Sequence, residues 1–389
     1  MSASPPLGRA ASERPGFLRQ HAVKLLASAI ITACLVYALQ SGGLKIFPVG
    51  VSFARVRWWT VPVYLSTLIA MSYFRAARWR FLLRGRVDIP TRRLVAVSWI
   101  GFAAILILPF RIGEFVRPYM IRSAGRMEDG RRVGHVSMSM ATGTILAERI
   151  IDFLYLSSVL AVALVWVPTL DPLPKTVVDL KVTVEQVRIY GFTMLGVSTV
   201  AFIVIAVFYF ARAWAHRATL TVFGLVSRPV GAKLAGIAES LADGLHLLGR
   251  GRDAWPFFIE TTFYWGINVL GMWLLAWGCG VAHADGSAIT FGETCALMGM
   301  LGVTILIPGP PGLLGVFQAG IYAGMTMYFP KDIVKGNGAA YVFLLYAIQV
   351  GWTLMGAAIF LLADRSARSA LGEAEAAAER GDQERPTGQ

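Results

Sequence analysis

The chain has 389 residues, of which 56% are hydrophobic and only 15% are charged, and its mean hydropathy is +0.60. This composition is typical of a membrane protein with several spans and excludes an ordinary soluble enzyme. The formal net charge of +13 would suggest a nucleic-acid partner in a soluble protein. Here the Lys and Arg residues flank apolar segments, so we expect retention of positive charge on the cytoplasmic side and no nucleic acid.

The first apolar segments predict two membrane spans after a polar, disordered N-terminus at residues 1–22. These segments, at about 24–44 and 60–77, are long enough to cross a bilayer as helices. A strongly basic segment follows the second span and contains Arg75, Arg78, Arg80, Arg84, Arg86, Arg92 and Arg93. Excess Arg marks the cytoplasmic side, so we place the N-terminus inside and interpret Arg75 and Arg78 as interfacial anchors.

The charge pattern around residues 94–121 conflicts with a simple third span. Residues 94–110 are apolar and would end outside, yet the next segment contains Arg111, Arg117, Arg122, Arg126, Arg131 and Arg132. The conflict disappears if 94–121 enters and leaves the membrane from the cytoplasmic side, as two half-helices joined at 109–114. Two short full spans are the alternative, and they would leave the orientation of the later segments unchanged.

The second half of the chain predicts four more full spans and a second broken segment. The spans lie at about 136–168, 189–211, 255–281 and 339–363, and a basic amphipathic helix at 212–254 lies on the cytoplasmic surface. The segment 289–329 is interrupted by Pro and Gly and enters from the outer side. The tail at 366–389 is polar and is expected to be disordered in the cytoplasm.

The sequence therefore predicts an all-α integral membrane protein with a single membrane domain at 23–365. It contains about six full transmembrane helices and two broken re-entrant hairpins that enter from opposite faces. Interrupted segments at matching places in two halves are typical of transporters with inverted repeats, so an inverted repeat is a hypothesis for this chain.

A dense group of polar residues interrupts the first broken segment. Pro109 and Gly113 break the helix there. Arg111 and Arg117 each lie three residues from Glu114, so the three charges can pair on a helix or tight turn. Charges at membrane depth face a cavity or a partner, and Arg suits a phosphate. We predict that these two arginines bind an anionic headgroup, whereas the alternative is a structural ion pair at the membrane surface.

Three charges lie close together within the long span at 136–168. Glu148 and Asp152 are four residues apart on one helical face, and Arg149 lies between them. Apolar residues flank this group, so it is expected to face the bundle interior and to balance the arginines of the first break. The alternative is a set of charges that extend to the cytoplasmic interface.

The second break predicts irregular backbone that can approach an anion. Pro308, Gly309, Gly312 and Gly315 exclude a regular helix, and backbone N–H groups between glycines can form an anion-binding nest. Gln318 follows as a neutral donor and acceptor. The alternative is a tight turn between two spans. Other polar residues that could line a cavity or join helices are Glu260, Tyr264, Asn268, Glu293 and Gln349.

Signatures of soluble catalysis and of metal binding are missing from the sequence. It contains no GxSxG, P-loop, HExxH or Rossmann motif, so no catalytic residue is assigned. Its three cysteines are isolated and its five histidines are scattered. We therefore expect no disulfide framework, no metal and no cofactor.

Four motifs follow one another in an order that resembles a known family. They are Arg75-x-x-Arg78-Trp79, Pro109-x-Arg111-x-Gly113-Glu114-x-x-Arg117, Glu148-Arg149-x-x-Asp152 and Pro308-x-Pro310-x-Gly312-x-x-Gly315. This order resembles the lysylphosphatidylglycerol synthase transmembrane-region family, also called flippase-like membrane proteins, over about residues 20–365. The family includes the flippase half of multiple peptide resistance factors and proteins associated with hopanoid synthesis.

The resemblance implies a membrane protein that translocates or handles lipids, with two departures from the family. Only a short tail follows the last span, so we expect no aminoacyltransferase domain and no lysyl transfer. Many family members have Glu where this chain has Gln318, so a proton-coupled role is not expected at that position.

The sequence thus predicts a lipid flippase or transporter in a bacterial inner membrane, with both termini in the cytoplasm. Its substrate would be a lipid with an anionic headgroup, of the phospholipid or polyprenyl-phosphate type. The main alternative is a non-transporting scaffold that recruits a glycosyltransferase or a lipid-synthesis enzyme through residues 212–254. A membrane-embedded lipid transferase ranks last, since no pair of nucleophile and base stands out.

Overall fold

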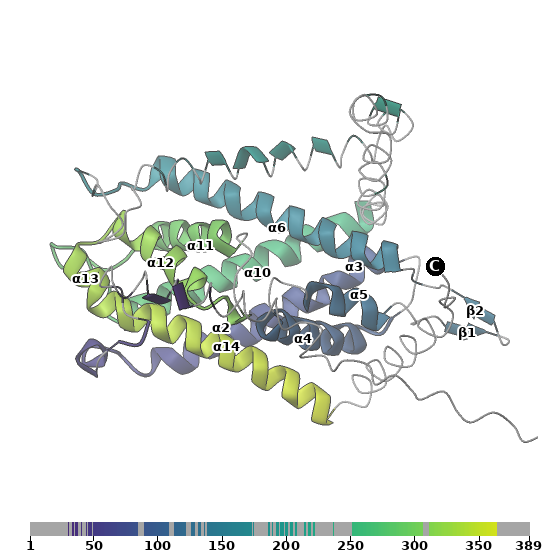
Figure 1. The fold of residues 1–389 in the computed structure, drawn as a ribbon, viewed down its shortest axis with the longest axis horizontal. Helices are drawn as coiled ribbons and strands as arrows, with labels where there is room; N and C mark the ends of the chain where they lie inside the picture. Colours follow the sequence, from purple (N-terminus) through teal and green to yellow (C-terminus); the bar gives the residue numbers. More distant parts are fainter. Residues whose placement is uncertain are drawn as a thin grey trace, which may run out of the picture.

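The computed structural model is a bundle of helices whose long members run along one axis (Figure 1). It describes residues 50–84, 89–108, 113–121, 126–128, 131–133, 138–172, 251–305 and 311–363, together with separate positions in 30–48, at 136 and 174, and in 186–236. The bundle begins with η1 (Gly50–Phe53), α2 (Thr60–Ala77), α3 (Trp79–Leu83), α4 (Thr91–Ile107) and α5 (Val116–Ile121). Strands β1 (Arg126–Glu128) and β2 (Arg131–Val133) form a short antiparallel hairpin before α6 (Met138–Trp166). The C-terminal elements are α10 (Gly251–Gly278), α11 (Phe291–Ile305), η4 (Pro311–Leu313), α12 (Val316–Thr326), α13 (Lys331–Lys335) and α14 (Asn337–Ala363).

Three of the described helices are longer than a bilayer core is thick. Helices α6, α10 and α14 contain 29, 28 and 27 residues. At about 1.5 Å per residue each is about 40 Å long, which exceeds a hydrocarbon core of ~30 Å. By length and apolar composition together, Met140–Trp166 and Asn337–Leu362 qualify as spans among the described residues, and Phe291–Ile305 is a shorter apolar helix. The helical bundle agrees with the predicted class of all-α membrane protein.

Glycines allow the helices of the bundle to approach one another closely. A Cβ on Gly271 of α10 would collide with Thr67 of α2, and one on Gly278 would collide with Thr60. Since the residue numbers rise along one helix and fall along the other, α2 and α10 are antiparallel. Small residues at contacts are typical of helices that associate within a membrane.

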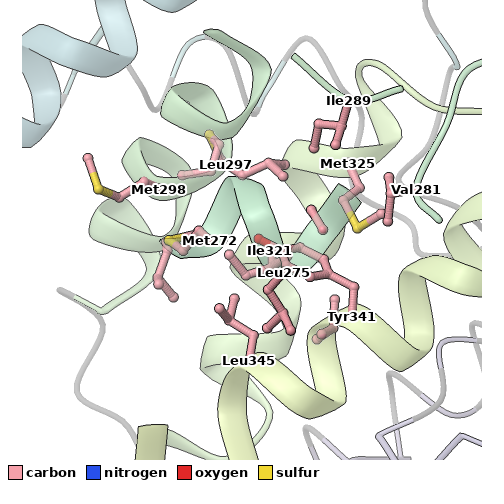
Figure 2. Close-up of a cluster of buried hydrophobic side chains, with 14 of the residues drawn as sticks. Met272, Leu275, Val281, Ile289, Leu297, Met298, Ile321, Met325, Tyr341 and Leu345 are labelled. Carbon is pink, nitrogen blue, oxygen red and sulfur yellow. The ribbon is translucent and has the colours of Figure 1, made fainter. Parts of the chain in front are cut away.

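Two apolar clusters form the core, and charged residues lie between them. The larger cluster surrounds Met272, Leu275 and Ile321 in α10 and α12 (Figure 2). The smaller one surrounds Trp79 of α3 and Phe257 near the start of α10. Between these clusters, α2, α6 and α10 each carry polar side chains, which places a polar layer inside the bundle.

The predicted segments agree with the described helices at most positions. The predicted span at 60–77 coincides with α2, and those at 136–168, 255–281 and 339–363 correspond to α6, α10 and α14. The two broken segments are divided into α4 and α5, and into α11, η4 and α12. Helix α3 and the β1–β2 hairpin lie in basic segments to which no helix or strand was assigned from the sequence. The predicted elements at 24–44, 189–211 and 212–254 and both tails lie wholly or largely outside the described residues.

Candidate functional site

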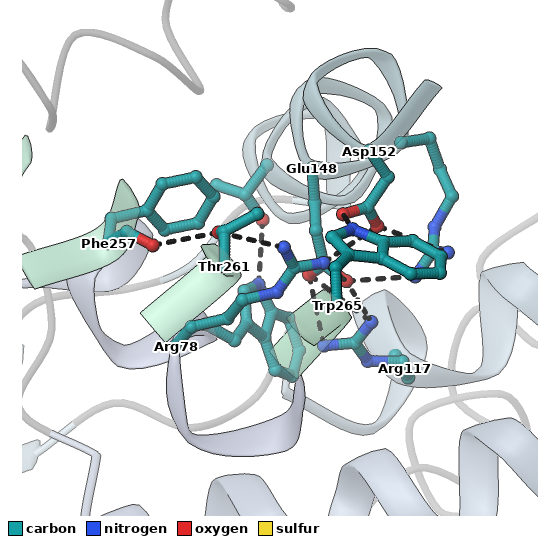
Figure 3. A network of polar contacts seen from close by, with 10 residues as sticks. Arg78, Arg117, Glu148, Asp152, Phe257, Thr261 and Trp265 are labelled. Atoms are coloured by element: carbon teal, nitrogen blue, oxygen red, sulfur yellow. Dashed lines mark hydrogen bonds and ion pairs between the residues drawn. The ribbon is translucent and has the colours of Figure 1, made fainter. Parts of the chain in front are cut away.

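A network of buried charged side chains joins three parts of the chain (Figure 3). Arg78 lies where α2 ends and α3 begins, and Arg117 lies on α5. Glu148 and Asp152 lie one turn apart on α6. Each of these four side chains belongs to a residue that is at most 2% exposed, so bulk water does not solvate their charges. An unpaired charge in such surroundings costs several kcal/mol, which is why charges of both signs occur together.

Glu148 lies at the centre of this network. Its carboxylate accepts hydrogen bonds of 2.8 Å from Nη2 of Arg149 and 3.3 Å from Nη2 of Arg78, and it lies 3.4 Å from the guanidinium of Arg117. Asp152 accepts a hydrogen bond of 2.7 Å from the same Nη2 of Arg78. The spacing of four residues on α6 thus brings both carboxylates to one guanidinium, as expected for residues on one helical face.

Side chains of α10 complete the network. Nη1 of Arg78 donates a hydrogen bond of 3.0 Å to Oγ1 of Thr261, and Nε1 of Trp265 donates one of 3.2 Å to Oδ1 of Asp152. The guanidinium of Arg78 also lies 4.9 Å from the ring centroid of Tyr264, within the range of a cation–π contact. These contacts fix Arg78 and Asp152 in one geometry.

A cavity of about 140 Å³ lies beside the network. Among the described residues, its charged lining residues are Arg75, Arg149 and Asp152, and its neutral polar ones include Trp265, Tyr346, Gln349 and Thr353. The end of α4, the end of α11 and the turn at η4 also line it, through Leu106, Ile305 and Gly312. Both broken segments therefore end at the same cavity.

Arg75 is a cation on the wall of this cavity, and no described residue forms a hydrogen bond or ion pair with it. Its Nε is buried without an acceptor. Its guanidinium carbon lies 4.1 Å from the ring centroid of Phe102 on α4. The ring holds the side chain in place but does not neutralise its charge. Arg75 is therefore available to an anion inside the cavity.

The charges around the cavity sum to a positive value. Among the described residues, Arg75 and the three arginines that contact Glu148 stand against the two carboxylates of Glu148 and Asp152, which leaves a surplus of +2. Glu114 is half-buried and interacts electrostatically with Arg149, and with it included the surplus is +1. In a region that excludes bulk water, such a surplus favours the binding of an anion.

In the second break, the described turn at η4 is stabilised by glycine backbone conformations and by hydrogen bonds to side chains. Gly312 has a φ of +69°, a conformation that suits glycine, and its carbonyl accepts a hydrogen bond of 2.9 Å from Oη of Tyr346 on α14. The N–H of Gly315, where φ is +88°, donates a hydrogen bond of 2.7 Å to Oε1 of Gln318 at the start of α12. These bonds place the η4 turn at the cavity wall.

Most of the predicted site residues lie at or beside this network. Arg117, Glu148, Arg149 and Asp152 belong to it, Gly312 lines the cavity, and Gly113, Glu114, Gly315 and Gln318 lie in the two breaks. Gly113 packs so closely on the backbone of Ala104 in α4 that no Cβ fits there. Arg111, Pro308 and Gly309 lie outside the described residues, so their roles stay predictions. Within the described part of the chain, no group of His, Cys, Asp and Glu is arranged to hold a metal ion.

Two arginines of the site were given a different role by the sequence. Arg75 and Arg78 close an apolar span, which is also the pattern of interfacial anchors. Arg78 is fully buried instead, so that interpretation is wrong for Arg78, and Arg75 lines the cavity. The sequence did contain a signal for this burial. The two carboxylates within the apolar α6 require buried cations from another helix, and Arg75 and Arg78 close the nearest preceding span.

The other polar residues named from the sequence divide between the cavity and separate contacts. Gln349 lines the cavity, and the ring of Tyr264 contacts the guanidinium of Arg78. Glu260 forms an ion pair with Arg80, and Glu293 forms one of 3.0 Å with His283 near the start of α11. The amide of Asn268 contacts the sulfur of Met298 at 3.9 Å. Only the first two therefore belong to the site.

Comparison with known proteins identifies the family of the chain. No curated protein and no solved structure matches it. A family model described as the lysylphosphatidylglycerol synthase transmembrane region matches residues 24–361, which is most of the chain and includes every residue of the network. The chain therefore belongs to the lysylphosphatidylglycerol synthase transmembrane-region family and is a membrane protein with a lipid-related function.

Proposed function

We propose that this protein is a flippase or transporter that moves a lipid with an anionic headgroup between the leaflets of a bacterial inner membrane. The observation that carries the proposal is Arg75, a cation without an anionic partner among the described residues, on the wall of a buried cavity. A phosphate would supply the missing negative charge, and the planar guanidinium suits it. The lipid would be of the phospholipid or polyprenyl-phosphate type.

The depth of the cavity supports a role in transport. Asp152 lies at the midpoint of α6, and Trp265 and Gln349 lie close to the midpoints of α10 and α14. If these long helices cross the bilayer, the cavity lies near its midplane. Binding sites of secondary transporters lie at this depth, where a bound group is equally far from both surfaces.

The two broken segments support a gate at the same place. Leu106 at the end of α4 and Gly312 in η4 both line the cavity, although they lie in opposite halves of the chain. We infer that α4–α5 and α11–α12 are re-entrant hairpins that enter from opposite faces and form an inverted repeat. Movement of one hairpin against the other would expose the headgroup to each side in turn.

Exposed aromatic residues and the basic segment after α2 support an orientation with both termini inside. Trp58 and Trp59 precede α2, Trp166 ends α6, and Phe291 begins α11, and all four are exposed. Since α2 and α10 are antiparallel, as are α6 and α11, these residues gather at one end of the bundle. Aromatic residues are enriched at both membrane interfaces, and because the basic segment with Arg80, Arg84 and Arg92 follows α2 at the opposite end of the bundle, we assign this end to the outer surface.

The network suggests separate roles for the arginines. Arg117 lies against Glu148, so we assign these two residues to charge balance rather than to direct contact with the headgroup. Glu148 and Asp152 are both engaged by arginines, which favours charge balance over proton transfer and does not favour a general base. We therefore assign headgroup contact to Arg75, and Arg111 stays a second predicted contact.

Proteoliposomes that contain fluorescent lipids test the proposal. A membrane-impermeant quencher bleaches only the outer leaflet unless the protein exchanges lipids, so the purified chain should allow bleaching beyond that leaflet. Arg75→Gln should slow the exchange about tenfold or more, because a charged hydrogen bond to the phosphate is lost. Arg84→Gln is the control, since Arg84 is exposed and lies beyond α3. If the wild-type chain exchanges no lipid, the scaffold with a glycosyltransferase or lipid-synthesis partner becomes the better proposal.

A further inference from the structure

Apart from Arg75, Arg149 and Asp152, the described polar residues that line the cavity are neutral, and this has a consequence for the headgroup. We infer that the cavity selects a small phosphate headgroup without an amine. Its phosphate would lie between Arg75 and Arg149, and its uncharged part would lie against Gln349 and Thr353 of α14. This inference rests on the proposed function and names the class of headgroup that the site takes.

Arg149 has hydrogen-bonding capacity left on the cavity side. Its Nη2 donates to Glu148 at 2.8 Å, whereas its Nη1 lies 3.6 Å from Oδ2 of Asp152, too far for a hydrogen bond. Arg75 lines the same cavity. Two arginines that line one cavity, one of them with an Nη1 that forms no short hydrogen bond to a described residue, match the several acceptor oxygens of one phosphate.

Among the described residues that line this cavity, an amine in the headgroup would find no free carboxylate. Asp152 is the acidic residue among its described lining residues, and Arg78 and Trp265 already donate to both of its oxygens at 2.7 and 3.2 Å. The surrounding charge is positive, so an ammonium group would be repelled. A headgroup with one phosphate and no amine avoids this electrostatic repulsion.

The size and polarity of the remaining wall fit a small uncharged substituent. The cavity volume of about 140 Å³ is below the range of roughly 300–1,000 Å³ that is usual for drug-sized ligands, so the acyl chains stay outside it. Thr353 donates its hydroxyl hydrogen to the carbonyl of Gln349 at 2.8 Å, which leaves its oxygen free to accept. The side-chain amide of Gln349 both donates and accepts. Hydroxyl groups on the headgroup would form hydrogen bonds with both of these side chains.

Lipid exchange in proteoliposomes tests the selectivity with four headgroups on the same labelled acyl chains: phosphate, phosphoglycerol, phosphoethanolamine and phosphocholine. The wild-type protein should exchange the first two about tenfold or more faster than the two amine-bearing lipids, since an unpaired charge is buried with the latter. Gln349→Leu should slow the exchange of the glycerol lipid selectively. Gln349→Glu should admit the ethanolamine lipid, because it supplies the missing carboxylate.

Equal exchange of all four lipids, or an unchanged preference in both Gln349 variants, would overturn the inference and leave the proposed function intact.

If no lipid is exchanged, the proposed function fails, and binding decides the inference. Thermal unfolding of the full chain in detergent is then measured with short-chain versions of the four lipids. Stabilisation by the two amine-free lipids alone supports the selectivity, and stabilisation by none refutes it. Equal stabilisation by soluble glycerol phosphate would assign the cavity to a free phosphate ester instead of a lipid.

Discussion

Glu148 is the residue on which the buried charges converge. Arg78, Arg117 and Arg149 all approach its carboxylate within 3.4 Å, and Glu148 itself is fully buried. Removing one member of a buried ion pair leaves its partners charged and without compensation. The stability of this region therefore depends on one carboxylate more than on any single arginine.

Glu148→Ala should lower the free energy of unfolding by about 3–5 kcal/mol, because three buried arginines lose their shared partner. Denaturant-induced unfolding of the purified protein in mixed micelles measures this change. Glu260→Ala is the matched control on α10, where the side chains of Glu260 and its partner Arg80 are 14% and 30% exposed. A partly solvated pair of this kind contributes about 1 kcal/mol or less. Equal losses in the two variants would contradict the central role of Glu148.

At the scale of helices, the contact between α2 and α10 positions the site. Arg75 and Arg78 lie on or just after α2, and Thr261 and Trp265 lie on α10. Close approach of these helices depends on Gly271 and Gly278, where added side-chain atoms would meet α2. A small shift between the two helices would therefore move the arginines relative to the side chains of α10 that hold them.

Gly271→Ala should destabilise the protein by about 1–3 kcal/mol, because the new Cβ collides with Thr67 and forces the helices apart. Gly266→Ala is the control on the same helix, since nothing lies within 4 Å of its Cβ position. Alanine is the better helix former, so this control should be neutral or stabilise by up to about 1 kcal/mol. Thermal unfolding of the two variants in detergent provides the measurement, and the same sign of change in both would refute the packing argument.

At the scale of the whole molecule, the proposed orientation predicts which surface positions face the outside of the cell. Gly50 in η1 lies near the exposed tryptophans that precede α2, whereas Arg84 follows α3 at the other end of the bundle. In a background with Cys34, Cys279 and Cys295 replaced by Ala, Gly50→Cys should react with a membrane-impermeant maleimide added to spheroplasts. Arg84→Cys should react only after the cells are opened. The reverse pattern would invert the topology, and labelling of both positions in closed cells would exclude it.

The sequence by itself determined the class of protein, the family and the positions of most helices. Composition and apolar length identified a membrane domain, because only helices of that length satisfy their backbone in lipid. Pro and Gly marked both breaks, since they interrupt a helix wherever it lies. The carboxylates at Glu148 and Asp152 were recognised because their spacing of four residues is a property of one helix.

Only the tertiary structure decided which of the many arginines meet these carboxylates and which one remains open to a ligand. Arg75, Arg78 and Arg117 all lie near the ends of apolar segments, and a one-dimensional pattern does not distinguish an interfacial anchor from a buried partner. The distinction depends on the antiparallel contact of α2 with α10 and on the place of α5 beside α6. These are contacts between residues far apart in the chain, so the burial of Arg78 and the cavity at Arg75 follow from packing rather than from local spacing.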